Sequence, residues 1–121
     1  MLRTALTTAL LLVLGTASAQ GPRPIQIIER SYELDLSRVV FPLGPAGSVI
    51  VKPCAECTNV IHQVDGSTSY LLNAAPVSYE DFMLMVDERR RIDGGRMTSV
   101  GVYYDVETKK VKRILLSYAA Q

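Results

Sequence analysis

Hydrophobic and polar positions alternate along much of the chain, and this period of two predicts β-strands. Between Tyr32 and Leu36, apolar residues alternate with acidic ones, a pattern typical of a strand with one buried face. Residues 39–41 either extend this strand or pair separately. Further strands are expected at residues 48–52, 60–64, 68–72, 99–104 and 111–118.

Turn signals separate these strands. Proline and glycine cluster in residues 42–47, and Asp65-Gly66 is a dipeptide that favours tight hairpin turns. We therefore expect residues 60–64 and 68–72 to pair as a hairpin.

The last two strands form a second expected hairpin. Residues 105–109 supply its turn, where the Asp105 side chain can hydrogen-bond the backbone. The connections between strands are short, which predicts antiparallel pairing throughout. Gly101 lies in the middle of a strand and predicts a sharp bend, as at the corner of a barrel.

One segment, from Ser78 to Ile92, carries the signals of a helix. Ser78 is a good N-cap, Asp81 follows it at the position of a capping box, and Gly94-Gly95 supplies the stop. Acidic residues occupy the first turn and arginines the last, which suits the helix dipole. One face of this helix is apolar, with Phe82, Met83 and Val86.

These elements predict a mainly β protein with one helix. A chain of 121 residues is long enough for one domain. A flat open sheet would leave one face in water, so a curled sheet uses the apolar residues better. We expect a small curled antiparallel sheet or barrel of six to seven short strands, with the helix covering one end.

The first 19 residues have the pattern of a secretory signal peptide. Arg3 gives a basic start, residues 5–14 are mostly apolar, and Ala-Ser-Ala ends at position 19. The apolar stretch is about half of the roughly 20 residues that a membrane helix needs, although an uncleaved anchor is the alternative. We expect export, most simply to a bacterial periplasm, with residues 20–24 as a flexible lead-in and 25–121 as a single β-rich domain without a transmembrane segment.

The stretch from Thr68 to Leu115 resembles a pattern in small exported bacterial proteins of unknown function. There, a strand leads to Pro-Val-Ser and an acidic helix start, and two strands joined by a tight turn follow. The matching residues are Pro76, Val77, Ser78, Glu80, Asp81, the run 100–105 and the run 111–114. The resemblance implies a β-barrel-like domain and brings no catalytic residue with it.

Cys54 and Cys57 are the sharpest chemical feature. In an oxidising compartment they can form a structural disulfide, since a two-residue spacer lets a turn bring them together. A redox pair would need an activating helix N-terminus, and a strand pattern follows instead. With His62, the spacing also matches three zinc ligands, but the fourth position holds Ser67. A labile or intermolecular disulfide is the last alternative.

His62 has a simpler interpretation of its own. It lies in the middle of an expected strand, on the face opposite Ile61 and Gln63. A single histidine in such a place is most often a partly exposed surface group.

Charge is divided along the chain. Residues 20–88 hold nine acidic and four basic residues, whereas residues 89–121 hold three acidic and eight basic ones. If the helix end and the last hairpin lie together, the basic residues form one patch: Arg89, Arg90, Arg91, Arg96, Lys109, Lys110, Lys112 and Arg113. Such a patch would dock an acidic protein or an anionic envelope component. The alternative is that these residues complement the helix dipole and decorate a solvated turn.

The composition of the chain excludes several classes of function. With 48% hydrophobic residues and a net charge of +1, the chain is neither disordered nor basic enough for a typical nucleic-acid-binding domain. It has one histidine and lacks the Gly-x-Ser-x-Gly and phosphate-loop motifs. We expect an exported, non-enzymatic module that binds a protein or envelope component without a cofactor. The alternative is a redox or metal-binding protein that uses Cys54, Cys57 and His62.

Overall fold

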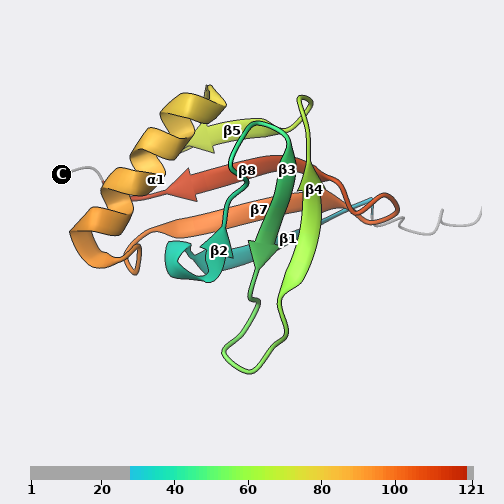
Figure 1. Cartoon of the computed structure of the whole chain (residues 1–121), viewed down its shortest axis with the longest axis horizontal. Helices are drawn as coiled ribbons and strands as arrows, with labels where there is room; N and C mark the ends of the chain where they lie inside the picture. Colours follow the sequence, from blue (N-terminus) through green and yellow to red (C-terminus); the bar gives the residue numbers. More distant parts are fainter. Residues whose placement is uncertain (1–27, 120–121) are drawn as a thin grey trace, which may run out of the picture.

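A computed structural model describes residues 28–119, which form two β-sheets, one α-helix and one 3-10 turn (Figure 1). The larger sheet contains β1 (Glu29–Asp35), β7 (Ser99–Asp105), β8 (Val111–Ser117), β5 (Ser69–Leu72) and β6 (Ala75–Val77), in that order. The smaller sheet contains β2 (Val39–Val40), β3 (Gly47–Val51) and β4 (Val60–Val64). The helix α1 spans Tyr79–Asp93, and the 3-10 turn η1 spans Leu36–Arg38. The expected signal peptide and lead-in lie outside the described residues.

The larger sheet is mixed, so the expectation of antiparallel pairing throughout was wrong. β1 pairs with β7 and β7 with β8 in antiparallel fashion, but β5 lies parallel to β8, with Ser69 opposite Arg113. The chain runs through β6, α1 and β7 between these two strands. That long connection lets it return in the same direction, which a short turn would not allow.

The expected hairpin at Asp65-Gly66 was also wrong. The turn exists, but it carries the chain from the smaller sheet (β4) to the larger one (β5). Thr68 holds the turn against the larger sheet, since its buried hydroxyl donates to the carbonyl oxygen of Val111 at 2.9 Å and accepts from the Asp65 N–H.

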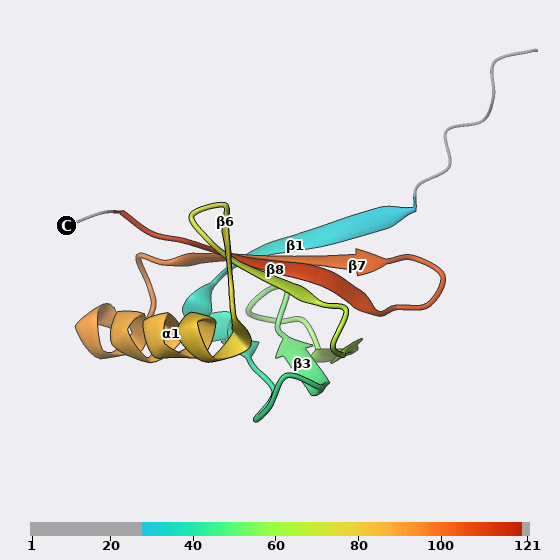
Figure 2. The same cartoon turned by 90° about the horizontal axis from the view of Figure 1, so that it is seen from above.

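The smaller sheet and α1 cover the same face of the larger sheet (Figure 2). The strands of the smaller sheet run across those of the larger one (Figure 1). Buried apolar side chains fill the space between the layers: Leu36, Val49, Val51, Phe82, Val86, Val100, Val102, Ile114 and Leu116. Two layers bury these residues without closing the sheet. The predicted barrel, including the one implied by the resemblance, is therefore replaced by two open sheets.

The predicted helix is confirmed to within one residue at each end. The Ser78 hydroxyl accepts a hydrogen bond from the Asp81 N–H at 3.1 Å, as an N-cap does. Gly94 ends the helix in the left-handed conformation with φ of 70°.

Gly101 marks a close contact and not the expected bend. β7 keeps its register across this residue. A Cβ atom at position 101 would lie 2.9 Å from Cε2 of Tyr103, so the tyrosine ring lies over the glycine. The irregularity in the pairing of β7 with β8 falls between Tyr103 and Tyr104 instead.

Candidate functional site

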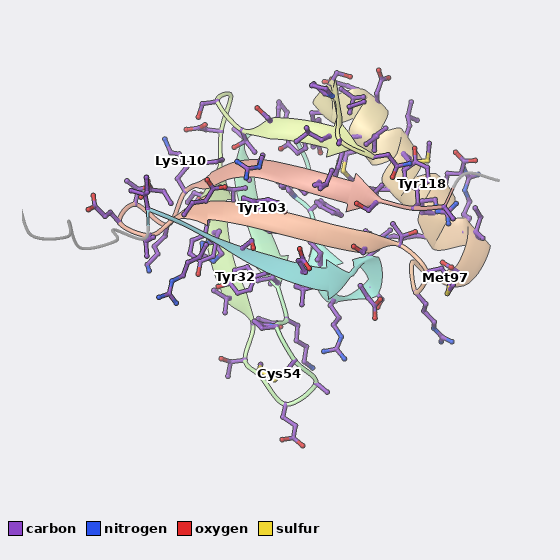
Figure 3. The ribbon with its side chains drawn as sticks, turned by 180° about the vertical axis from the view of Figure 1, so that it is seen from behind. Tyr32, Cys54, Met97, Tyr103, Lys110 and Tyr118 are labelled. Atoms are coloured by element: carbon purple, nitrogen blue, oxygen red, sulfur yellow. A yellow bond between two sulfur atoms is a disulfide. The ribbon has the colours of Figure 1, made fainter. Side chains whose placement is uncertain are left out.

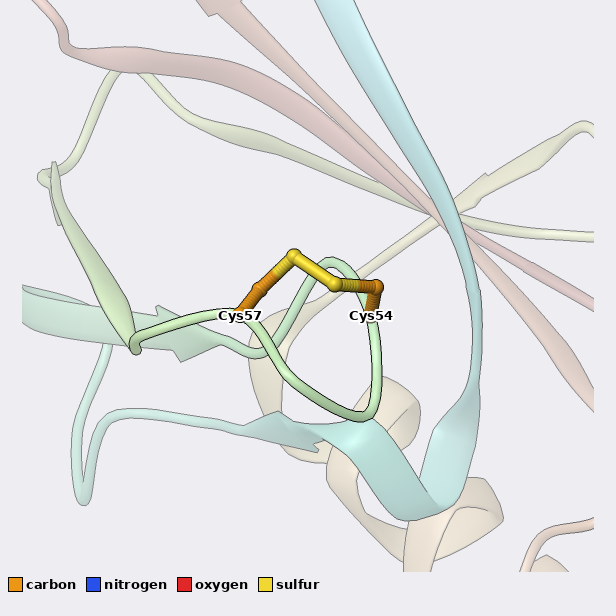
Figure 4. The surroundings of a disulfide bond; sticks show 2 residues. All are labelled: Cys54 and Cys57. Carbon is orange, nitrogen blue, oxygen red and sulfur yellow. A yellow bond between two sulfur atoms is a disulfide. The ribbon is translucent and has the colours of Figure 1, made fainter.

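The two cysteines form a disulfide in the loop between β3 and β4, with their Cα atoms 4.9 Å apart (Figure 4). This loop projects from the body of the protein (Figure 1, Figure 3). Its turn is closed by a hydrogen bond from the Cys57 N–H to the Cys54 carbonyl oxygen at 3.2 Å. Cys54 is exposed and Cys57 half-buried. The predicted disulfide is confirmed.

His62 is buried, with only 3% of its surface exposed, so its interpretation as a surface group was wrong. The ring donates from Nδ1 to the carbonyl oxygen of Lys109 at 2.8 Å, and its Nε2 lies 3.2 Å from the Tyr32 hydroxyl. It also lies against the ring of Tyr104, with the centroids 4.3 Å apart. His62 is buried because the inward face of β4 meets the end of the β7–β8 hairpin, where these partners satisfy both ring nitrogens.

The structure does not bring the three candidate zinc ligands together. The sulfur atoms of Cys54 and Cys57 are bonded to each other, and both nitrogens of His62 face other groups. Among residues 28–119, no group of three or more histidine, cysteine, aspartate or glutamate side chains is placed to hold a metal ion.

The eight basic residues do not form a single patch. Those at the end of α1 and those in the β7–β8 hairpin lie at opposite ends of the molecule (Figure 1, Figure 2). Arg89 is buried, donates from Nε to the Thr98 hydroxyl at 3.0 Å and packs over the Tyr118 ring. Arg90 donates to the carbonyl oxygen of Val39. These two arginines therefore hold the helix on the sheets.

At the hairpin, acidic neighbours pair with two of the basic groups. Lys110 lies 2.6 Å from Asp65, and this contact, with a hydrogen bond from Ser67, lowers the pKa of Asp65 to about 2. Arg113 lies 2.9 Å from Glu29 and over the ring of Tyr103. The hairpin does not present an unbroken basic surface.

A groove of about 600 Å³ lies between β1 and the disulfide loop, and we call it the β1 groove. Its walls are formed by Glu33, Leu34, Asp35, Arg38, Pro53, Cys54, Ala55 and Ser99. Figure 4 shows β1 passing beside Cys54. Two carboxylates and one guanidinium make the groove acidic on balance.

The β1 groove borders an unpaired strand edge. The larger sheet ends in β1 on one side and β6 on the other. β6 has three residues and includes Pro76, both of which protect an edge from pairing. β1 has seven residues, contains neither proline nor glycine, and pairs with β7 in unbroken register. Its other side can accept a further strand.

Sequence reasoning identified the disulfide but missed the groove. The acidic residues of β1 were recognised as the polar half of an alternating strand, and nothing nearby in sequence indicates that Cys54 lies beside them. The length of β1 and its lack of proline were the available signals of an open edge. Whether β1 lies at an edge depends on the strand order, in which β7 pairs with β8 on its other side.

No helix among residues 28–119 has the length and apolar character needed to span a membrane. Comparison with protein-family models, curated proteins and solved structures finds no match to this chain.

Proposed function

We propose that the protein is an exported, non-enzymatic module that binds another protein or envelope component, and that it captures an extended, basic segment of that partner. The segment would lie in the β1 groove and add a strand to the free edge of β1. The observation that carries this proposal is the long, proline-free β1 at the edge of the sheet, beside a groove of about 600 Å³.

Strand addition suits this edge because backbone groups supply the binding energy and neighbouring side chains the selectivity. Glu33 and Asp35 line the groove, and their negative charges favour lysine or arginine in the partner. The same charges oppose pairing of β1 with β1 of a second copy, since like charges would face one another. The disulfide loop forms the opposite wall.

The proposed role uses no catalytic group. The one histidine of the chain is committed to the fold through both ring nitrogens. The basic residues that we expected to form the contact surface are divided between two ends of the molecule, and Arg89 is buried. The acidic groove is therefore a better-supported contact than the basic patch.

A labelled peptide of alternating lysine and valine tests the proposal by fluorescence anisotropy. We expect it to bind the intact protein, and the double variant Glu33→Lys/Asp35→Lys to weaken binding at least about ten-fold. The matched control is Asp87→Lys/Glu88→Lys, which makes the same change of charge at two exposed positions of α1 and should leave binding unchanged. A loss of binding only in the control variant would move the site to α1.

Thiol–disulfide exchange is the second candidate, because Cys54 is exposed and lines the β1 groove. It predicts that a mild reductant opens the disulfide and that the resulting thiol has a pKa near neutrality. A thiol titration under increasing reductant distinguishes the two roles. A disulfide that resists mild reduction supports binding alone.

A further inference from the structure

The last turn of α1 and the turn that follows it form one end of the molecule, opposite the β7–β8 hairpin (Figure 1, Figure 2). We call this end the helix tip and define it by four exposed residues: Arg91, Ile92, Arg96 and Met97. Met97 lies at the edge of the molecule (Figure 3) with 76% of its surface exposed, and Ile92 is 49% exposed. Each of these apolar residues directly follows an arginine, so the tip presents apolar and basic side chains together.

The turn that carries Met97 is held in place by the rest of the protein. The two carboxylate oxygens of Asp93 accept hydrogen bonds from the N–H groups of Gly95 at 2.8 Å and Met97 at 3.1 Å. The next residue, Thr98, is buried, and its carbonyl oxygen accepts from the Leu36 N–H at 2.9 Å. Met97 is therefore exposed on a braced turn, so that inserting it into a partner costs little ordering of the backbone.

The two arginines of the helix tip are available to an anionic partner. Within residues 28–119, neither Arg91 nor Arg96 forms an ion pair with a carboxylate. Asp93, which lies between them in sequence, is engaged with the two amide groups of the turn. The next acidic residues, Asp87 and Glu88, lie about one helical turn back from the end of α1. A surface that approaches the end of the helix therefore meets a positive net charge.

The size and chemistry of the helix tip suit a lipid surface better than a protein surface. A stable protein interface buries about 800 Å² on each partner, whereas the tip offers four side chains at one end of the molecule. A bilayer adapts to such a projecting end. Lipid phosphate groups bind arginine, and the boundary between headgroups and acyl chains takes up apolar side chains.

We propose that the helix tip docks the protein on an anionic lipid surface, with Met97 and Ile92 inserted at the acyl boundary and Arg91 and Arg96 on the phosphate groups. This contact goes beyond strand capture at β1, because it uses none of the residues that line the β1 groove. It adds a membrane-docking site to the protein.

The first test measures the dependence on charge by sedimentation with lipid vesicles. Vesicles of phosphatidylcholine with about 30% phosphatidylglycerol are compared with vesicles of phosphatidylcholine alone, at about 0.1 M salt. We expect partition onto the anionic vesicles to be at least about twenty-fold stronger, and Arg91→Gln/Arg96→Gln to lower this ratio at least about ten-fold, since each arginine contributes about five-fold. The matched control, Lys109→Gln/Lys112→Gln, removes the same charge at two exposed positions of the opposite end and should keep the ratio.

The second test measures insertion of the apolar side chains. The chain contains no tryptophan, so the fluorescence of Met97→Trp reports on the helix tip alone. Its emission should shift to shorter wavelength when anionic vesicles are added, because the side chain leaves water. Leu43→Trp, at a fully exposed apolar position between β2 and β3, is the control and should keep its emission.

Met97→Ser removes the apolar side chain and should lower partition onto the anionic vesicles at least about three-fold. Leu43→Ser, the matched control, should leave partition unchanged. Equal partition of the unaltered protein onto the two kinds of vesicle, or an unchanged ratio in Arg91→Gln/Arg96→Gln, would overturn the proposal. Binding that needs the arginines but leaves the emission of Met97→Trp unchanged would overturn it as well, and would indicate a purely electrostatic contact such as an acidic protein makes.

Discussion

The Nδ1 atom of His62 lies 2.8 Å from the carbonyl oxygen of Lys109, so a side chain of the smaller sheet is bonded to the β7–β8 hairpin of the larger one. A carbonyl oxygen only accepts, which places the proton on Nδ1 and lets Nε2 accept from the Tyr32 hydroxyl in the neutral ring. This pair of bonds joins the two sheets near the hairpin end of the core.

Replacing His62 with alanine should therefore loosen the contact between the sheets. The change leaves two partly buried polar partners unpaired and creates a cavity, which together should lower the free energy of unfolding by about 2–4 kcal/mol. Urea denaturation measures this loss. Gln63→Ala, on the exposed face of the same strand, is the control and should change stability by less than about 0.5 kcal/mol. A small effect at His62 would mean that the sheets do not depend on this contact.

Two arginines two residues apart should behave differently. Arg89→Met removes a bond to Thr98 and the contact with Tyr118, and should lower the free energy of unfolding by about 1–3 kcal/mol. Arg91 is exposed, so Arg91→Met should be close to neutral. Chemical denaturation of both variants checks the difference. Similar effects from the two substitutions would contradict the structural role of Arg89.

The disulfide should stabilise the protein modestly. It closes a very short loop, for which the chain-entropy model gives about 2 kcal/mol. The variant Cys54→Ser/Cys57→Ser should lose that amount and keep its fold, because neither cysteine belongs to the buried core. Denaturation and an NMR spectrum of the variant measure the two effects. Global unfolding of the variant at room temperature would show that the loop matters more than its size indicates.

Alkaline pH should destabilise the protein through two tyrosines. Burial, with the neighbouring Tyr79, raises the pKa of Tyr70 to about 12, and burial with Tyr104 raises the pKa of Tyr32 to about 12. The folded state then keeps a proton that the unfolded chain has lost, so stability present below pH 10 falls as the pH rises toward 12. For buried Tyr70 this lowers the free energy of unfolding by about 2 kcal/mol at pH 12, and for half-buried Tyr32 by less, because solvent screens its charge.

Tyr70→Phe provides the control for this pH dependence. Without the Tyr70 hydroxyl, the fall in unfolding free energy between pH 10 and 12 should be less steep, and Tyr32 and Tyr79, whose pKa values burial also raises, should retain part of it. Urea titrations at a series of pH values give the slope directly. An unchanged slope would contradict the assignment of the alkaline transition to Tyr70.

The helix could be predicted because its signals are adjacent in sequence. Ser78 and Gly94 act through hydrogen bonds and backbone angles within one turn of the helix. The burial of Arg89 could also have been predicted from its position. This residue lies on the same helical face as Phe82 and Val86, both of which are buried. Because Arg89 is charged, we assigned it to a surface patch instead.

The sheets could not be predicted in the same way. The Asp65-Gly66 turn has the same local sequence whether it closes a hairpin or connects two sheets, and the choice depends on β5 pairing with β8 at the far end of the chain. Likewise, the alternation of side chains along the strand predicted that His62 lies on the face opposite Ile61 and Gln63. Its burial depends on Lys109, which is 47 residues away.

The most direct test of the central proposal is to map peptide binding on the amide groups of β1. Isotope-labelled protein is titrated with the lysine–valine peptide and with a version whose alternate backbone nitrogens are methylated, which cannot form the ladder of a strand. The proposal predicts shifts and slowed hydrogen exchange along Glu29–Asp35 and in the loop at Cys54 with the first peptide, and neither with the second. Equal responses to both peptides, or shifts that leave β1 unaffected, would contradict it.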